Sequence, residues 1–257
     1  MFAEERRVKI VTMLETSQDV TVKKLSDLFK VSEVIIRKDL QRLEEEKKLK
    51  RTHGGAISLR KIVHSSNVSS RLMNARASHK LIAEIAFKQI NENETILLDT
   101  SASNILLAEL IAYKPKKLTV ITNMLEVSQI LSNINEINLI CTGGIYSKIL
   151  GAFSGGLAID ALSKFNCDKL FLGTAGINLN NGYLSNFDIE EGKTKSAMID
   201  VSDSIYLLAD NSKFYQDALY RFAPLAEIDY VITDKIPDNF IGLTLKKLGI
   251  TVLGPAE

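Results

Sequence analysis

The 257-residue sequence has no tryptophan, four prolines, three histidines and two cysteines. Two cysteines cannot supply the disulfide framework of a small secreted protein, and Cys141 and Cys167 both stand in apolar, strand-like runs. We therefore expect two buried free thiols and a cytoplasmic protein. The histidines, His53, His64 and His79, show no metal-ligand spacing, so we expect no metal site.

Long hydrophobic runs are also missing. No apolar run approaches the roughly 20 residues that span a bilayer, which argues against a membrane protein. The first residues include Glu4, Glu5, Arg6 and Arg7 and lack the apolar core of a signal peptide. The sequence shows neither a cysteine–histidine nucleophile pair nor a Walker-type lysine loop, so it predicts no catalytic residue and no cofactor.

Positive charge is unevenly spread along the chain. The whole sequence has a net charge of +1, but residues 1–62 contain 15 Lys or Arg against 10 Asp or Glu, a net of +5. Residues 63–257 contain 17 against 21, a net of −4. A basic head on an acidic body is expected where one domain meets phosphates and the other does not, although chance variation explains this asymmetry about as well.

The first 59 residues predict a small domain that begins with three helices. The first helix runs from about Glu4 to Glu15, and its apolar face carries Val8, Val11 and Leu14, with Ile10 widening this stripe. Two shorter helices follow and are joined by a tight turn. Such a helix-turn-helix can place its second helix in the major groove of DNA.

The helix-turn-helix has recognisable caps and a recognisable buried face. Thr21 is placed to cap its first helix, and Ser32 can cap the second. In the second helix, Ile36, Leu40 and Leu43 recur at spacings of four and three, so they should face the core. The rest of that helix then points outward, toward DNA.

A wing is predicted directly after this helix. Leu49-Lys50-Arg51 begins an extended segment, Gly54-Gly55 permits a sharp hairpin, and Ala56–Leu59 can return as a second strand. The residues expected to meet bases or phosphates lie at the helix caps, on the outward helix face and along the wing. They are Thr21, Ser32, Val34, Ile35, Arg37, Lys38, Gln41, Arg51 and His53.

Residues 78–257 predict a second domain, and the serine-rich residues 60–77 predict a linker. Seven apolar runs predict strands, at 96–98, 118–121, 137–141, 169–172, 205–209, 230–232 and 251–253. Helical periodicity fills most of the gaps, for example at 104–113, 125–132, 157–165 and 190–200. Alternating strands and helices predict an α/β domain with a mostly parallel sheet, which follows an α+β winged head.

Polar residues follow five of the predicted strands. Ligands of open α/β sheets bind beyond the carboxyl ends of the strands, and hydroxyls, glycines, carboxylates and lysines there suit a phosphorylated sugar. The loop 100–103 could hold an anion at a helix N-terminus, Asp99 and Asp210 could accept bonds from hydroxyls, and Lys195 or Lys213 could supply charge. The same residue types are also the commonest in turns, so each loop alone is more simply a turn.

The candidate effector residues are those at the five strand ends together with an acid and a base on a later helix. They are Asp99, Thr100, Ser101, Ser103, Asn123, Gly143, Gly144, Glu191, Lys195, Asp210 and Lys213. Glu191 and Lys195 are four residues apart, so an ordinary ion pair along one helix is the simpler interpretation of these two.

These segments are similar to those of the DeoR family of regulators, over nearly the whole chain. The head resembles the family's winged helix-turn-helix at residues 31–33, 36–40 and 51–56, and the sensor resembles the family's at residues 98–99, 122–123, 143–144 and 210–213 and at Glu191 with Lys195. The resemblance implies a sensor fold related to sugar-phosphate isomerases. It also implies a phosphorylated-sugar effector that alters DNA binding.

Four positions depart from the family's usual residues. Ile35 replaces Thr, so its contact must be apolar, for example to a thymine methyl group. Lys38 replaces Arg and keeps the charge without the bidentate geometry. Ser101 stands in place of Gly in the first sensor loop, and Gly192 in place of Ala in a later helix.

A repressor of sugar-metabolism genes is the function that the sequence favours. A head of about 60 residues has a small footprint, so we expect a homo-oligomer, a dimer or tetramer, on paired half-sites of double-stranded operator DNA. One alternative is a sugar-phosphate isomerase or deaminase with an accessory DNA-binding domain, which could use Asp99, Glu191 and Asp210 in acid–base chemistry. A scaffold without a ligand would leave the polar strand ends unexplained.

Overall fold

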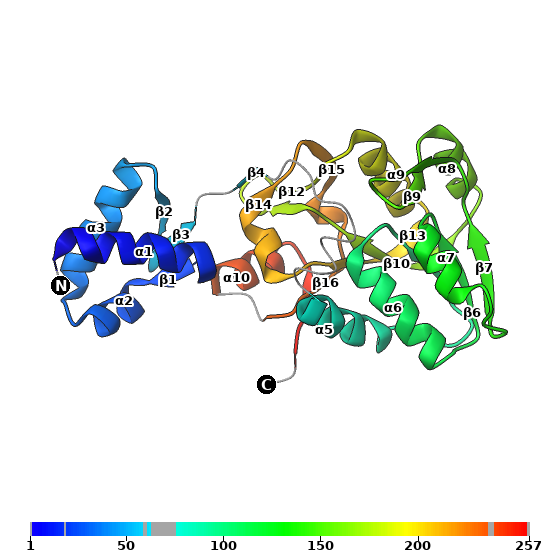
Figure 1. Ribbon diagram of the computed structural model, residues 1–257, viewed down its shortest axis with the longest axis horizontal. Coiled ribbons are helices and arrows are strands. Elements are labelled where there is room, and N and C mark those ends of the chain that lie inside the picture. The colour runs from blue at the N-terminus through cyan, green and yellow to red at the C-terminus, as the bar shows by residue number, and fades with distance from the viewer. Residues whose placement is uncertain (1, 18, 59–60, 63–75, 236–238, 256–257) are drawn as a thin grey trace. The chain divides into compact units, whose positions relative to one another are not determined.

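A computed structural model describes residues 2–17, 19–58, 61–62, 76–235 and 239–255 (Figure 1). The chain divides into two compact units, Met1–Lys61 and Ile62–Glu257, and the short strand β4 (Lys61–Ile62) spans the boundary. Most of the predicted linker, and His64 with it, lies outside the described residues.

The first unit is a winged helix-turn-helix, as predicted. Its helices are α1 (Ala3–Ser17), α2 (Val22–Phe29) and α3 (Glu33–Glu45), and its strands are β1 (Asp19–Thr21), β2 (Leu49–Thr52) and β3 (Gly55–Ser58). The strands form an antiparallel sheet in the order β1-β3-β2. The sequence did not predict β1, because three residues are too few to show a strand period.

The buried face of α1 differs from the predicted one. Ile10 and Leu14 are buried, but Val8 is 60% exposed, so its assignment to the core was wrong. Arg6 is buried instead, because its Nε atom lies 2.5 Å from Oδ2 of Asp39 on α3. The spacing of four from Arg6 to Ile10 to Leu14 therefore defines the packed face.

Only one of the two predicted N-cap residues makes a capping hydrogen bond. Thr21 caps α2, since its hydroxyl accepts a bond from the backbone N–H of Lys24 at 3.2 Å. Ser32 occupies the N-cap position of α3, but its side chain makes no capping bond, so that part of the prediction was wrong. Between them Lys30 has a φ of 53° and closes the turn in the left-handed region.

The second unit is built on a seven-stranded sheet. Its strands are β5 (Thr95–Leu98), β6 (Leu118–Thr122), β7 (Ile137–Cys141), β10 (Cys167–Gly173), β13 (Ser202–Leu208), β16 (Tyr230–Ile232) and β17 (Thr251–Leu253). Every neighbouring pair is parallel, in the order β17-β16-β13-β10-β5-β6-β7. All seven predicted strands and the parallel sheet are confirmed.

Helices cover both faces of this sheet (Figure 1). One face carries α5 (Arg76–Phe87), α6 (Ala102–Tyr113) and α7 (Leu125–Leu131), and the other carries α8 (Gly156–Leu162) and α9 (Ile189–Asp200). Leu98, Val120 and Phe171 belong to the core beneath α5–α7. The side chains of their sequence neighbours Leu97 and Leu170 point to the other face of the sheet and are equally buried. Burial on both faces explains why the strands are apolar without alternation.

Shorter elements complete the second unit. A hairpin joins β8 (Ile145–Ser147) to β9 (Ala152–Ser154), and a small antiparallel sheet contains β11 (Gly176–Asn178), β12 (Tyr183–Asn186) and β15 (Tyr220–Pro224). The remaining elements are η1 (Asn211–Tyr215), β14 (Gln216–Asp217), η2 (Leu225–Glu227) and α10 (Asn239–Lys247). The sequence predicted none of these, because each is too short or too irregular to show a clear period.

The strand order reverses between β5 and β10. From β5 the chain proceeds outward through β6 to β7, whereas from β10 it proceeds in the opposite direction through β13, β16 and β17. At such a switch point the loops after the two central strands diverge and leave room for a ligand at the carboxyl edge. The residues after β5 and β10 are therefore the first place to look for a site.

The two cysteines are both free, but only one is buried. Cys167 begins β10 and is 1% exposed, whereas Cys141 is exposed at the end of β7. The expectation of two buried thiols was wrong for Cys141, because β7 is the edge strand of the sheet. Among the described residues, the structure contains no helix long and apolar enough to cross a membrane.

Candidate functional site

The α3 helix presents the predicted residues to solvent. Ile36, Leu40 and Leu43 are buried, as predicted, which leaves the opposite face open. Val34 is 63% exposed and Ile35 is 40% exposed. The exposed face also carries the side chains of Arg37, Lys38 and Gln41.

The polar side chains of this face differ in their partners. Nη2 of Arg37 lies 2.8 Å from a carboxylate oxygen of Glu33, and Nε2 of Gln41 donates to Glu45 at 3.1 Å. Lys38 makes no ion pair within the described part of the chain. The Lys38 ammonium group could therefore contact a phosphate without first breaking an ion pair.

The wing residues Arg51 and His53 are also exposed. Arg51 lies on β2, where its backbone N–H donates to Oε1 of Glu44 at 2.8 Å, so the base of the wing is tied to the end of α3. His53 stands in the turn between β2 and β3. These positions leave both side chains available to a DNA backbone beside the groove.

In the sensor, Asp99 directly follows β5 at the switch point. Its carboxylate is fully buried and accepts bonds from Nδ2 of Asn104 at 2.8 Å and from the backbone N–H of Gly173 at 2.7 Å. Gly173 ends β10, and a Cβ atom added there would lie 2.5 Å from Cβ of Ser101. Only glycine fits this approach, so the loops after β5 and β10 meet closely.

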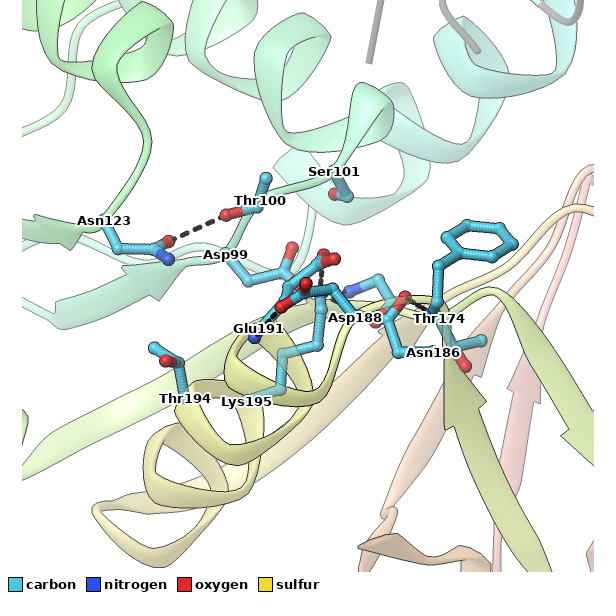
Figure 2. A network of polar contacts seen from close by, with 12 residues as sticks. Asp99, Thr100, Ser101, Asn123, Thr174, Asn186, Asp188, Glu191, Thr194 and Lys195 are labelled. Atoms are coloured by element: carbon cyan, nitrogen blue, oxygen red, sulfur yellow. Dashed lines mark hydrogen bonds and ion pairs between the residues drawn. The ribbon is translucent and has the colours of Figure 1, made fainter. Parts of the chain in front are cut away.

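Lys195 of α9 reaches into the same place. Its ammonium group is ion-paired with Oδ2 of Asp99 and donates to the carbonyl of Gly173 at 3.2 Å. Oε1 of Glu191 lies 3.7 Å from the same ammonium group, and all three side chains are at least 95% buried (Figure 2). The ion pair between Glu191 and Lys195 thus exists, but it belongs to a buried cluster and not to a solvated helix face.

Two more predicted residues are joined beside this cluster. The hydroxyl of Thr100 donates to Oδ1 of Asn123 at 3.2 Å, which links the loops after β5 and β6 (Figure 2). Ser101 caps α6, since its hydroxyl accepts from the N–H of Asn104 at 3.3 Å. The Ser103 hydroxyl lies 3.0 Å from Nδ1 of His79 on α5. The first turn of α6 is therefore held by α5 and by the neighbouring loop.

The other predicted effector residues make no hydrogen bond or ion pair with this cluster in the described structure. Gly143 and Gly144 follow β7 with φ values of 66° and 116°. Asp210 caps η1, and Nζ of Lys213 lies 3.8 Å from its carboxylate. Both loops follow strands of the same parallel sheet, β7 at its edge and β13 next to the central β10, so they border its carboxyl edge.

Several residues of the site were not predicted. Asn104 donates to Asp99, Asp188 caps α9 by accepting from the N–H of Glu191 at 2.8 Å, and the hydroxyl of Thr194 accepts from the N–H of Gly155 at 3.3 Å. Asn186 is 1% exposed at the end of β12. Asn104 could have been recognised, since it follows the polar loop directly; Asn186 lies in an irregular segment without a pattern.

The cluster is chemically a hydrogen-bonding site that contains more acidic than basic side chains. Two carboxylates and one ammonium group are buried together, which suits a ligand with several donors better than an apolar one. Among the described residues, no group of three or more His, Cys, Asp or Glu side chains could hold a metal ion.

Known proteins resemble both units. Residues 6–61 match the DeoR-like helix-turn-helix domain, and residues 74–235 match the DeoR C terminal sensor domain. The uncharacterized HTH-type transcriptional regulator YulB of Bacillus subtilis (strain 168) is 34% identical, with 98% of each chain covered. The transcriptional repressor AccR of Agrobacterium fabrum is 31% identical, with 95% of each chain covered.

A third relative is the HTH-type transcriptional repressor GlcR of Bacillus subtilis, which is 30% identical over 98% of this chain and 96% of its own. Among solved structures, ribose 5 phosphate isomerase A from Neisseria gonorrhoeae aligns with a TM-score of 0.39 and 15% identity, over 55% of this chain and 52% of that chain. The two domain matches together cover most of the sequence, and the curated relatives match it from end to end. The chain therefore belongs to the DeoR family of transcriptional regulators.

Proposed function

We propose that this protein is a transcriptional repressor whose binding to operator DNA is modulated by a phosphorylated sugar. The observation that carries the proposal is the buried cluster of Asp99, Glu191 and Lys195 at the switch point of the sensor sheet. Burying ionisable groups costs free energy unless they are paired or hydrogen-bonded, within the protein or by a ligand. This sheet edge is where ligands of such folds bind. Relatives named as repressors support the direction of regulation.

The phosphate would bind at the start of α6. This helix begins after the hydroxyl-bearing Thr100 and Ser101, and its N-terminus carries a partial positive charge. The sugar would then extend from there toward Asp99 and Lys195. Asn123 lies beside Thr100 and so borders this part of the site.

A thermal-shift measurement on the full chain tests the effector class. The probes are glucose 6-phosphate, fructose 6-phosphate, fructose 1-phosphate, ribose 5-phosphate, the free sugars and inorganic phosphate. A phosphorylated sugar that binds the folded state at 100 times its Kd should add about 2.7 kcal/mol to the free energy of unfolding. A flat response to every phosphorylated sugar would contradict the proposal, and conversion of a probe to an isomer would indicate an enzyme instead.

DNA binding is tested with fragments from upstream of the neighbouring genes. Lys38→Ala should weaken binding by removing the unpaired cation of α3, and Arg37→Ala should weaken it as well. Lys88→Ala is the matched control, because it removes the same charge from an exposed position of the sensor. Equal affinities for all three variants would remove α3 from the DNA-reading surface.

A further inference from the structure

Glu191 is the least satisfied charged group in the described sensor. It is 2% exposed, and neither of its carboxylate oxygens accepts a hydrogen bond. Its ion-pair partner, the Lys195 ammonium group, lies 3.7 Å away, which is beyond hydrogen-bond distance. A buried carboxylate with open lone pairs is costly in an empty site, and a ligand that donates to it removes that cost.

The carboxylate of Asp99, in contrast, has hydrogen-bond partners within the protein for both of its oxygens. Its Oδ1 accepts from Asn104, and its Oδ2 accepts from Gly173 and is ion-paired with Lys195. With three partners inside the protein, the carboxylate has little capacity left for sugar hydroxyls. Asp99 therefore acts as a positioning residue that holds the Lys195 ammonium group, and this differs from the acceptor role first expected for it.

The Asn186 side chain adds an open donor nearby. Its Nδ2 is buried and has no hydrogen-bond partner, whereas its Oδ1 accepts from the N–H of Phe187 at 3.0 Å. Asn186 ends β12 just before Asp188, the N-cap of α9, and Figure 2 shows it in the same polar network as Glu191. An open acceptor and an open donor together match a hydroxyl group, which can donate and accept at once.

The open acceptors at this end of the site decide which part of a ligand enters it. The Glu191 oxygens lack hydrogen-bond donors, and the oxygens of a phosphate mainly accept hydrogen bonds, so a phosphate does not satisfy them. Hydroxyl groups carry no charge and supply the missing donors. The unphosphorylated end of a polyol therefore fits here, and the phosphate belongs elsewhere.

We propose that Glu191 and Asn186 bind the hydroxyl groups at the unphosphorylated end of the effector, with Lys195 held by Asp99 to meet a ligand oxygen. The proposal rests on the proposed function, since it assigns a direction to the same ligand. It makes Glu191 a specificity-determining residue that distinguishes sugar phosphates by their hydroxyls.

Glu191→Gln is the decisive variant, and Glu190→Gln is its matched control. Glu190 is the adjacent residue of α9, but its carboxylate is half exposed and pairs with Lys193 at the surface. In the absence of ligand, Glu191→Gln should raise the melting temperature by about 2–4 °C, because it removes a buried carboxylate whose oxygens accept no hydrogen bond. The same variant should weaken binding of the sugar phosphate by about tenfold or more, whereas Glu190→Gln should change neither.

Inorganic phosphate serves as the second probe in the same titrations. Its stabilising effect should be the same in the wild type and in Glu191→Gln, because the phosphate does not contact Glu191. Glu191→Gln that destabilises the empty protein, or that binds the sugar phosphate as the wild type does, would overturn this proposal. A wild type that responds to no sugar phosphate would instead overturn the proposed function, so the two failures are distinguishable.

Discussion

At the scale of single residues, the Arg6–Asp39 ion pair is the most consequential contact of the head. Both side chains are at least 93% buried, and the contact joins α1 to the middle of α3. Nη1 of Arg7 lies 3.7 Å from the other oxygen of the same carboxylate. The ion pair therefore fixes the rotation of α3 relative to α1, and with it the direction in which Lys38 points.

Asp39→Asn should destabilise the head strongly, because it leaves the buried Arg6 charge without its partner. Removing one member of a buried pair typically costs about 3–5 kcal/mol. Denaturant unfolding followed by circular dichroism measures the loss, with Asp27→Asn on the exposed side of α2 as the control. The double variant Arg6→Met, Asp39→Leu should recover much of the stability; no recovery would show that the charges themselves are needed.

The two thiols should differ sharply in reactivity. Burial, together with the nearby charge of Asp168, raises the pKa of the Cys167 thiol to about 11, so this group stays protonated and unreactive below that pH. At pH 8, iodoacetamide should therefore label the exposed Cys141 alone, and mass spectrometry of the native protein identifies the site. Cys141→Ser should abolish labelling until the pH approaches 11 or the protein unfolds.

At the scale of elements, the packing of α9 explains an unusual residue. Gly192 stands inside this helix, and a Cβ atom added there would lie 2.4 Å from Cδ1 of Tyr220 on β15. The aromatic ring thus occupies the space of the missing methyl group. This close contact holds α9, which carries Glu191 and Lys195, against the small antiparallel sheet.

Gly192→Ala should destabilise the sensor despite the better helix propensity of alanine. The gain in propensity is about 0.5–1 kcal/mol, whereas overpacking costs about 1–3 kcal/mol. Gly192→Ala combined with Tyr220→Leu should cost less than the sum of the two single changes, because the smaller side chain clears the clash. Thermal unfolding of the four proteins measures this coupling, and simple additivity would show that the ring is not the obstacle.

The elements themselves were largely predictable from sequence, because their periodicity is a local property. Seven apolar runs became the seven strands, and Ile36, Leu40 and Leu43 were correctly placed in the core. Val8 was misplaced because the partner that sets the packed face, Asp39, is distant in sequence. The spacing of apolar residues along one helix cannot reveal an ion pair with a residue on another helix.

The sequence predicted where in the fold the candidate site lies, but not which of its residues contact one another. The strand-end rule indicated Asp99 and Asn123, Lys195 was expected to supply charge, and similarity to a family supported Glu191 with Lys195. The pairing of Asp99 with Lys195, 96 residues apart, depends on how α9 packs across the sheet, and no local pattern encodes that distance. For the same reason, Asn186 and the His79–Ser103 contact were missed.

At the scale of the whole molecule, the small surface of the head leads us to expect more than one copy of the chain on DNA. One α3 helix exposes few side chains, and a typical specific complex buries about 1,000–2,500 Å² of protein surface. Paired heads on two half-sites would double the contact. We therefore expect a dimer or tetramer.

Light scattering coupled to size-exclusion chromatography should give twice or four times the chain mass of 28.5 kDa. Operators with two half-sites about 10.5 base pairs apart, or a multiple of that, should be bound more tightly than single half-sites. A monomer that binds single and paired half-sites with equal affinity would contradict this expectation.

The order of the residues along the chain also fixes the order of their synthesis. The DNA-reading head is complete by Ser58, whereas the cluster at the switch point needs Asp99, Gly173 and finally Lys195. At about 5–20 residues per second, the ribosome delivers the last of these several seconds after the head. Under the proposed function, a polypeptide cut short between Ser58 and Lys195 would contain the complete head without the effector site, so any operator binding that it retained would not respond to sugar.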